Sequence, residues 1–256
     1  MKKILSLLAI AAMVCMAASC NKEKKTKHHD DGDDIEYNAP ITIDGNFADW
    51  ALLGDKVTSC SSLMEEGNDL KELKVYADEY FIYVYVKFNN TVPDPTWEDG
   101  LNHIVIDTFI NGDNDIDTGG YIGKWDQNIQ QGEETISKPC FDVMIYDSIY
   151  DKNTETGGQG FCYGDSYMEI QTWEGEPNTD GWDGKWALSD VEDFAVSNGN
   201  NLEYELAICR ELYPKGKMAD EFTMGVLASC GTWDATGWLP DAATGDAKPL
   251  TVRVDK

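Results

Sequence analysis

The sequence predicts an all-β fold: an antiparallel β-sandwich of the jelly-roll or immunoglobulin-like kind, with few short helices. Three observations support this. Several segments alternate apolar and polar residues with the period of two that is typical of half-buried strands. Turns rich in Gly, Asp and Asn separate these segments, and helical periodicity is scarce. Short strands joined by such turns are typical of a sandwich.

The clearest strands form a predicted hairpin over residues 73–77 and 80–88, joined at Asp78 and Glu79. In the second arm four apolar side chains share one face, namely Ile82, Val84, Val86 and Phe88. Tyr83 and Tyr85 lie on the other face, and both residue types favour strands. We therefore expect this arm to be a central strand.

The remaining strands are expected in chain order from the same pattern. We predict them at residues 41–43, 104–106, 141–147, 167–171, 186–188, 202–208, 222–228 and 250–254. In 202–208 the inward residues would be Leu202, Tyr204, Leu206 and Ile208. A helical turn is expected at 210–213, a short helix or a loop at 64–73, and loops at 91–100, 151–160 and 174–185.

The N-terminus has the features of an export signal. Lys2 and Lys3 precede an apolar run over 4–16, which is too short to span a membrane. Small residues then lead to Cys20, and the arrangement resembles a bacterial lipoprotein signal over 1–19. That resemblance implies lipidation of Cys20, membrane attachment through this lipid anchor, and an outer-membrane lipoprotein on the periplasmic or cell-surface side. An ordinary secretory signal cut nearby is the alternative.

Composition divides the rest of the chain in two. Residues 20–38 are almost wholly polar and are expected to form a disordered tether. Residues 39–256 are long enough for a single β-sandwich domain, expected to be monomeric. The formal net charge of −27 argues against nucleic acid and against anionic lipid as partners.

Five cysteines fall in the expected domain: Cys60, Cys140, Cys162, Cys209 and Cys230. An odd number cannot all pair within one chain. No two of them have the CxxC spacing of structural zinc sites. One or two disulfides, or buried free thiols, remain as the two interpretations.

An acidic loop follows the predicted strand at 104–106. It carries Asp107, Asp113, Asp115 and Asp117 among glycines. Alternate carboxylates can converge on a hard cation, and Ca²⁺ accepts such irregular oxygen sites. Asp142 would be a distant ligand. The alternative is a solvated turn, because Asp, Asn and Gly favour turns without any metal.

Tryptophan is frequent, with eight residues, and it supplies the second candidate site. Trp50 and Trp238 are expected in the core. The candidate ligand-binding residues lie in or beside polar loops and are Trp125, Asp126, Trp173, Trp182 and Trp186. Indole rings offer flat faces to the C–H faces of sugars, while neighbouring polar groups bind the hydroxyls. The alternative is that these rings cover apolar surface of the sandwich.

Catalysis has little support in the sequence. His103 is the only histidine of the expected domain, and no nucleophile elbow, phosphate-binding loop or zinc-protease motif is present. A pair of glycosidase carboxylates requires a separation and a raised pKa that sequence does not reveal. We therefore predict that the protein is not an enzyme, with a glycoside hydrolase as the less favoured alternative.

Short motifs in order resemble family 9 carbohydrate-binding modules and their DOMON-like relatives. They are the "IDG…DW" segment over 43–50, the strand at 83–86, Ile106-Asp107-Thr108 with the TGGY segment over 118–121, the strand at 204–208 and Trp238-Leu239-Pro240. The resemblance implies a sandwich with structural Ca²⁺ and favours the calcium interpretation of the loop. It also implies non-catalytic glycan binding. The alternative from another class is a structural or assembly lipoprotein that binds a protein partner.

Overall fold

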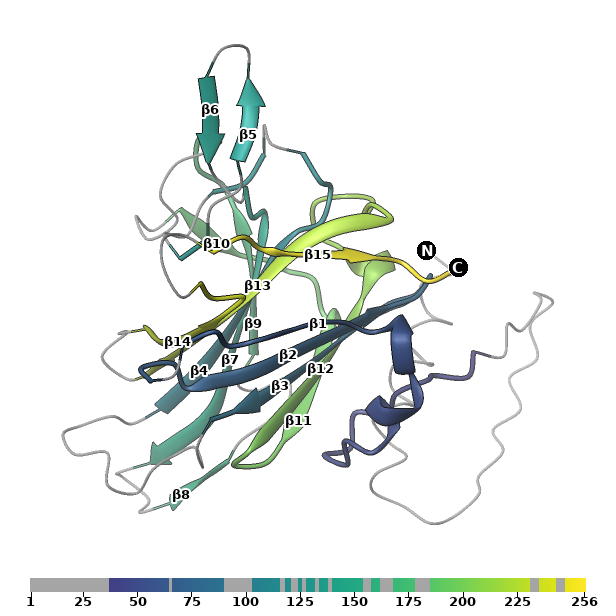
Figure 1. Cartoon of the computed structure of the whole chain (residues 1–256), viewed down its shortest axis with the longest axis vertical. Helices are drawn as coiled ribbons and strands as arrows, with labels where there is room; N and C mark the ends of the chain where they lie inside the picture. Colours follow the sequence, from purple (N-terminus) through teal and green to yellow (C-terminus); the bar gives the residue numbers. More distant parts are fainter. Residues whose placement is uncertain are drawn as a thin grey trace.

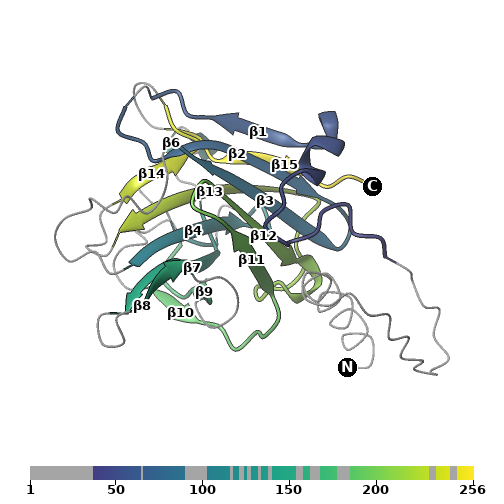
Figure 2. The ribbon, with the colours of Figure 1, turned by 90° about the horizontal axis from the view of Figure 1, so that it is seen from below.

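The computed structural model has two antiparallel β-sheets packed against each other (Figures 1 and 2). It describes residues 37–64, 66–89, 103–115, 118–120, 124–125, 128–131, 134–137, 140–153, 158–161, 168–177, 185–230, 235–242 and 247–256. The predicted all-β sandwich is therefore confirmed. Within the described ranges, the only helices are short 3-10 turns.

One sheet has five strands in the order β1-β2-β3-β12-β11. Their bounds are β1 Thr58–Ser61, β2 Leu70–Ala77, β3 Phe81–Phe88, β11 Ala195–Gly199 and β12 Glu203–Cys209. The 3-10 turns are η1 Asp49–Leu52, η2 Gly54–Lys56 and η4 Arg210–Leu212.

The other sheet has eight strands, six of them in the order β10-β9-β7-β4-β13-β14. Strand β15 pairs with β13, and β8 pairs with β7. Their bounds are β4 His103–Asn111, β7 Val143–Asn153, β8 Gly158–Phe161, β9 Met168–Trp173, β10 Trp186–Leu188, β13 Glu221–Cys230, β14 Ala235–Leu239 and β15 Leu250–Arg253. A separate hairpin, β5 Asn128–Gln131 and β6 Glu134–Ser137, stands at one end of the molecule in Figure 1.

The main core lies between the sheets. The apolar face of β3 meets β4, β7 and β13, as the alternation predicts, and the contributing residues include Val84, Val86, Ile106, Ile145 and Val226. Burying such side chains is the main favourable term in folding. One polar contact crosses this core: the Tyr204 hydroxyl of β12 donates to Asp147 Oδ2 of β7 at 2.9 Å.

The first described segment covers the outer face of the five-stranded sheet. Ile41, Ile43 and Trp50 are buried there against Tyr83 and Tyr85. This explains why residues 41–43 do not form the predicted strand: they contribute side chains to a sheet face and do not pair with a sheet edge. Both faces of β3 are consequently buried.

Buried Glu205 of β12 fastens this segment. Its Oε1 accepts the Gly45 N–H at 2.7 Å, and its Oε2 accepts Trp50 Nε1 at 3.4 Å. Gly45 has φ +79°, a conformation in which side chains with a Cβ are strained. The Asp-Gly turn and the tryptophan of the "IDG…DW" motif thus have a structural function.

Most predicted strands exist, but several boundaries differ. Strand β4 continues five residues beyond the predicted end at Ile106, so Asp107 lies inside a strand and not in the acidic loop. Strand β7 extends into the loop predicted at 151–160, and β8 lies at its end. Leu202 precedes β12 and is 46% exposed, which contradicts its predicted inward position. The 64–73 segment forms neither a helix nor a single loop, because β2 begins at Leu70.

Among the described residues, Cys60, Cys140 and Cys209 are thiols that form no disulfide. Cys162 lies outside the described residues, as do Cys20 and the whole predicted signal. In the part of the chain that the structure describes, no helix is long and apolar enough to cross a membrane.

Candidate functional site

The outer face of the eight-stranded sheet carries a row of polar and aromatic side chains. Strand register places Glu169, Tyr146, Asp107, Leu227 and Trp238 directly opposite one another, across β9, β7, β4, β13 and β14. Directly opposite residues of antiparallel strands point to the same side of a sheet. The row is therefore one continuous strip of this face.

Trp125 covers part of this face and belongs to the core. Its side chain is 0% exposed, packs on Phe109 and Phe141, and donates from Nε1 to the Pro240 carbonyl at 2.7 Å. Gly225 of β13 leaves room for the ring, since a Cβ there would lie 2.8 Å from it. With its ring covered in this way, Trp125 has no face to offer a sugar, so it acts as the lid that the alternative interpretation described.

Trp173 is also in the interior, with 4% of its surface exposed. It packs edge to face against Trp186, with ring centroids 5.3 Å apart. Its Nε1 donates to the Glu176 carbonyl at 3.3 Å. Trp173 therefore packs beside Trp186 on the same face and does not itself form a binding surface.

The open part of the face lies over β10, β9 and β7. Trp186 and Tyr146 are half-buried there, and Glu169 and Gln171 stand beside them on β9. The Gln171 amide donates to the Glu169 carboxylate at 3.0 Å, which orients both groups. Trp186 Nε1 is buried and has no hydrogen-bond partner among the described residues. The surface thus combines two aromatic rings with hydrogen-bonding groups.

Asp107 lies next to Tyr146 in this strip and is 4% exposed. Burial raises the pKa of its carboxyl to about 8, so the acid is largely protonated at neutral pH. Its Oδ1 has no hydrogen-bond partner among the described residues. Burial, reinforced by the charges of Asp107 and Glu169, raises the pKa of Tyr146 to about 12. Tyr146 therefore remains a neutral phenol.

The turn after β4 brings other predicted residues together. The Asp113 carboxylate accepts the Asp115 N–H at 2.9 Å and the Thr118 hydroxyl at 3.1 and 3.2 Å. Asp142 is buried beside this turn, and its Oδ1 accepts the Tyr213 hydroxyl and the Gly112 N–H. Burial raises the pKa of Asp142 to about 7, and the Asp113 charge adds to the effect. The second oxygen, Oδ2, is buried without a partner among the described residues.

These residues partly fit a hard cation. An orphaned buried carboxylate oxygen next to a second carboxylate is a favourable start for an oxygen-ligand site. Asp107 does not join it, because it faces Tyr146, about 13 Å along the strand from Asp142 at the usual rise per residue. Within the described ranges no group of three His, Cys, Asp or Glu side chains is placed to hold a metal. Asp117 lies outside those ranges.

Sequence reasoning found Trp186 but missed Tyr146, Glu169, Gln171 and the half-buried position of Trp238. The alternation in β7 and β9 shows which side chains share a face within one strand. It does not show that β7 lies between β4 and β9, because this pairing joins distant parts of the chain. Asp126 and Trp182 lie outside the described residues.

Comparison with known proteins found no relative of this chain. No family model matches the chain, and neither the curated proteins nor the solved structures contain a significant match.

Proposed function

We propose that this protein binds a glycan without catalysis, on the open outer face over β10, β9 and β7. The observation that supports the proposal most is the pairing of two half-buried rings, Tyr146 and Trp186, with Glu169 and Gln171 on the same face. Sugars present apolar C–H faces to such rings, and their hydroxyls bond to carboxylates and amides. The motif resemblance to family 9 carbohydrate-binding modules supports the same function.

Each side chain of this face would have its own role in glycan binding. Trp186 lies level with Trp173, about 13 Å along the strands from Tyr146, so the two rings would contact different sugar units of an oligosaccharide. Glu169 and Gln171 would accept and donate hydrogen bonds around the rim. Lipidation of Cys20 would keep this face at the outer membrane.

The test is a glycan array of defined neutral oligosaccharides, followed by calorimetry with any oligosaccharide that binds. We expect Tyr146→Ala and Trp186→Ala each to weaken binding about tenfold or more, because each removes a stacking surface. Phe47→Ala is the matched control, since Phe47 is half-buried against Tyr85 on the opposite sheet. No array signal, or equal losses in all three variants, would reject the proposed site.

We also propose that a calcium ion is held at the turn after β4. Asp113 and Asp142 would supply carboxylate oxygens, and the Asp115 carbonyl is a further candidate. The ion would fasten the turn and neutralise the buried Asp142.

Calorimetric melting with 1 mM CaCl₂ and with 1 mM EDTA tests the ion. We expect Ca²⁺ to raise Tm by several degrees, because a ligand that binds only the folded state stabilises it. Asp113→Asn should abolish the increase, and Asp190→Asn, which alters an exposed carboxylate elsewhere, should preserve it. An identical Tm with and without the chelator would count against the ion.

Glycoside hydrolysis is a second candidate, which one observation favours. Asp107 has a raised pKa and Glu169 lies two strands away on the same face, so their strands are about 10 Å apart. Inverting glycosidases hold an acid and a base about 6.5–9.5 Å apart. Release of reducing ends from an array-positive oligosaccharide, lost in Asp107→Asn, would establish hydrolysis in place of simple binding.

A further inference from the structure

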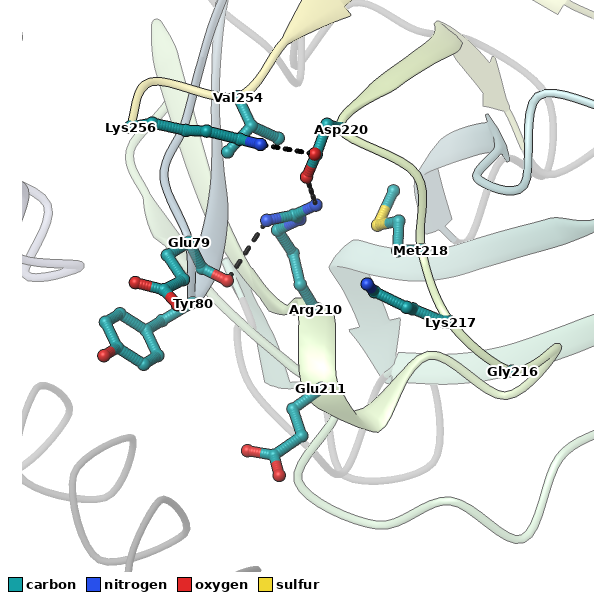
Figure 3. A pocket seen from close by; sticks show the side chains of 10 residues that line it. All are labelled: Glu79, Tyr80, Arg210, Glu211, Gly216, Lys217, Met218, Asp220, Val254 and Lys256. Atoms are coloured by element: carbon teal, nitrogen blue, oxygen red, sulfur yellow. Dashed lines mark hydrogen bonds and ion pairs between the residues drawn. The ribbon is translucent and has the colours of Figure 1, made fainter.

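A cavity of about 760 Å³ lies at one end of the sandwich, away from the proposed glycan face. Its walls come from the turn between β2 and β3, the η4 turn that follows β12, the segment leading into β13 and the C-terminal residues (Figure 3). Three cationic side chains line it: Arg210, Lys217 and Lys256. Tyr80, Met218 and Val254 add apolar surface. The cavity is therefore amphipathic.

Arg210 is held in place as a fixed cation. Its side chain is 8% exposed. Nη1 donates to the carbonyls of Asp78 and Glu79 at 2.8 and 3.1 Å, and Nη2 donates to the Ala219 carbonyl at 2.9 Å. The Nε–H is buried and has no partner among the described residues. A guanidinium already ordered by backbone contacts presents its positive charge to the cavity at little entropic cost.

Three carboxylates share the lining of the cavity with the three cations, and the carboxylate paired with this guanidinium is that of Asp220. The Asp220 carboxylate is shared, lying 3.6 Å from Arg210 Nη2 and 2.6 Å from Lys256 Nζ. No ion pair of Lys217 occurs in the described part of the chain. In Figure 3 the Lys217 ammonium points towards the side of the cavity where Arg210 lies, and the Glu211 carboxylate points away. Glu79 supplies the third carboxylate, so the formal charges of the lining cancel, whereas the whole chain has 47 acidic and 20 basic residues.

We propose that this cavity is an oxyanion-binding site that takes the carboxylate, phosphate or sulfate group of a small organic molecule. Lys217 and Lys256 supply mobile charge, and Arg210 supplies fixed charge. Tyr80 and Met218 contact the apolar part of the ligand. Charge-assisted hydrogen bonds of this kind are about twice as strong as neutral ones, which favours an anion over a neutral ligand.

An NMR titration of the isotope-labelled chain at constant ionic strength tests the site, with sodium phosphate, sodium sulfate and glucuronate as separate probes. We expect saturable shifts of the amide signals around Arg210 and Lys217. Lys217→Gln should weaken binding about tenfold, as expected for the loss of one charged partner. Asp220→Asn should strengthen it, because it removes the carboxylate that competes with the ligand.

Lys71→Gln is the matched control, because Lys71 is an exposed lysine near the start of β2 and distant from the cavity. All three altered side chains are largely exposed, so each variant should fold. The relative affinities of the three probes identify which oxyanion the site prefers. Shifts that fail to saturate with every probe, or that are equal in Lys217→Gln and Lys71→Gln, would overturn the proposal.

Discussion

Single buried polar residues link parts of this molecule that are far apart in sequence. Asp147 lies within the apolar core and accepts the Tyr204 hydroxyl across the two sheets. Glu205, only one residue further along β12, points to the opposite face and fastens the first described segment. The alternation of one strand therefore directs one polar anchor to each side of the five-stranded sheet.

Tyr204→Phe should lower the free energy of unfolding by about 1–3 kcal/mol, because it leaves the buried Asp147 carboxyl with one donor fewer. Urea denaturation at a fixed pH measures the change. Tyr80→Phe is the control, since Tyr80 is half-buried against Tyr37 and its substitution should change stability by less than about 0.5 kcal/mol. Equal effects of the two substitutions would show that the hydrogen bond between Tyr204 and Asp147 contributes nothing to the free energy of unfolding.

At the scale of elements, local alternation predicted β3 to within one residue because of its strong period of two, whereas β2 begins three residues before its predicted start at residue 73. The sequence predicts too early an end for strand β4, because Asp107 and Asn111 are residue types that strands seldom contain. Here the apolar neighbours Phe109 and Ile110 outweigh that preference, since both are fully buried. The candidate site depends on how β4, β7 and β9 pair, and pairing between distant segments leaves little local signal.

The packing of strand β13 against Trp125 gives a prediction about an element. Gly225→Ala should destabilise the protein by about 1–3 kcal/mol, because its Cβ would overlap the indole ring. The same substitution should cost less in a Trp125→Phe background, where the smaller ring leaves space. A double-mutant cycle with denaturant unfolding measures this coupling. Additive effects would mean that the glycine and the tryptophan are not in the described contact.

At the scale of the whole molecule, buried acids should make stability depend on pH. Burial raises the pKa of Asp147 to about 6 and of Glu205 to about 7. The folded state thus holds the carboxyl protons of Asp147 and Glu205 more tightly than the unfolded chain does. In the unfolded chain these carboxyls titrate at about pH 4. The associated stability is present below that pH and is lost as pH rises through about 6–7.

Urea unfolding at pH 5 and pH 8 should therefore show a decrease on the order of a few kcal/mol at the higher pH. The double variant Asp147→Asn/Glu205→Gln should show a smaller decrease, since amides do not titrate. General repulsion among the many surface acids is present in both proteins, so their difference isolates the two buried sites. Equal decreases in both proteins would contradict the assignment.

The first described segment lies on the side of the fold away from the proposed glycan face. Tyr37 donates to Asp78 at 2.5 Å and lies 2.9 Å from the Tyr83 hydroxyl, so the chain enters the fold against the five-stranded sheet. The proposed glycan face belongs to the other sheet, and the outer faces of a two-layer sandwich point in opposite directions. Tyr146 and Trp186 therefore lie on the side of the sandwich opposite to the one on which the described chain begins.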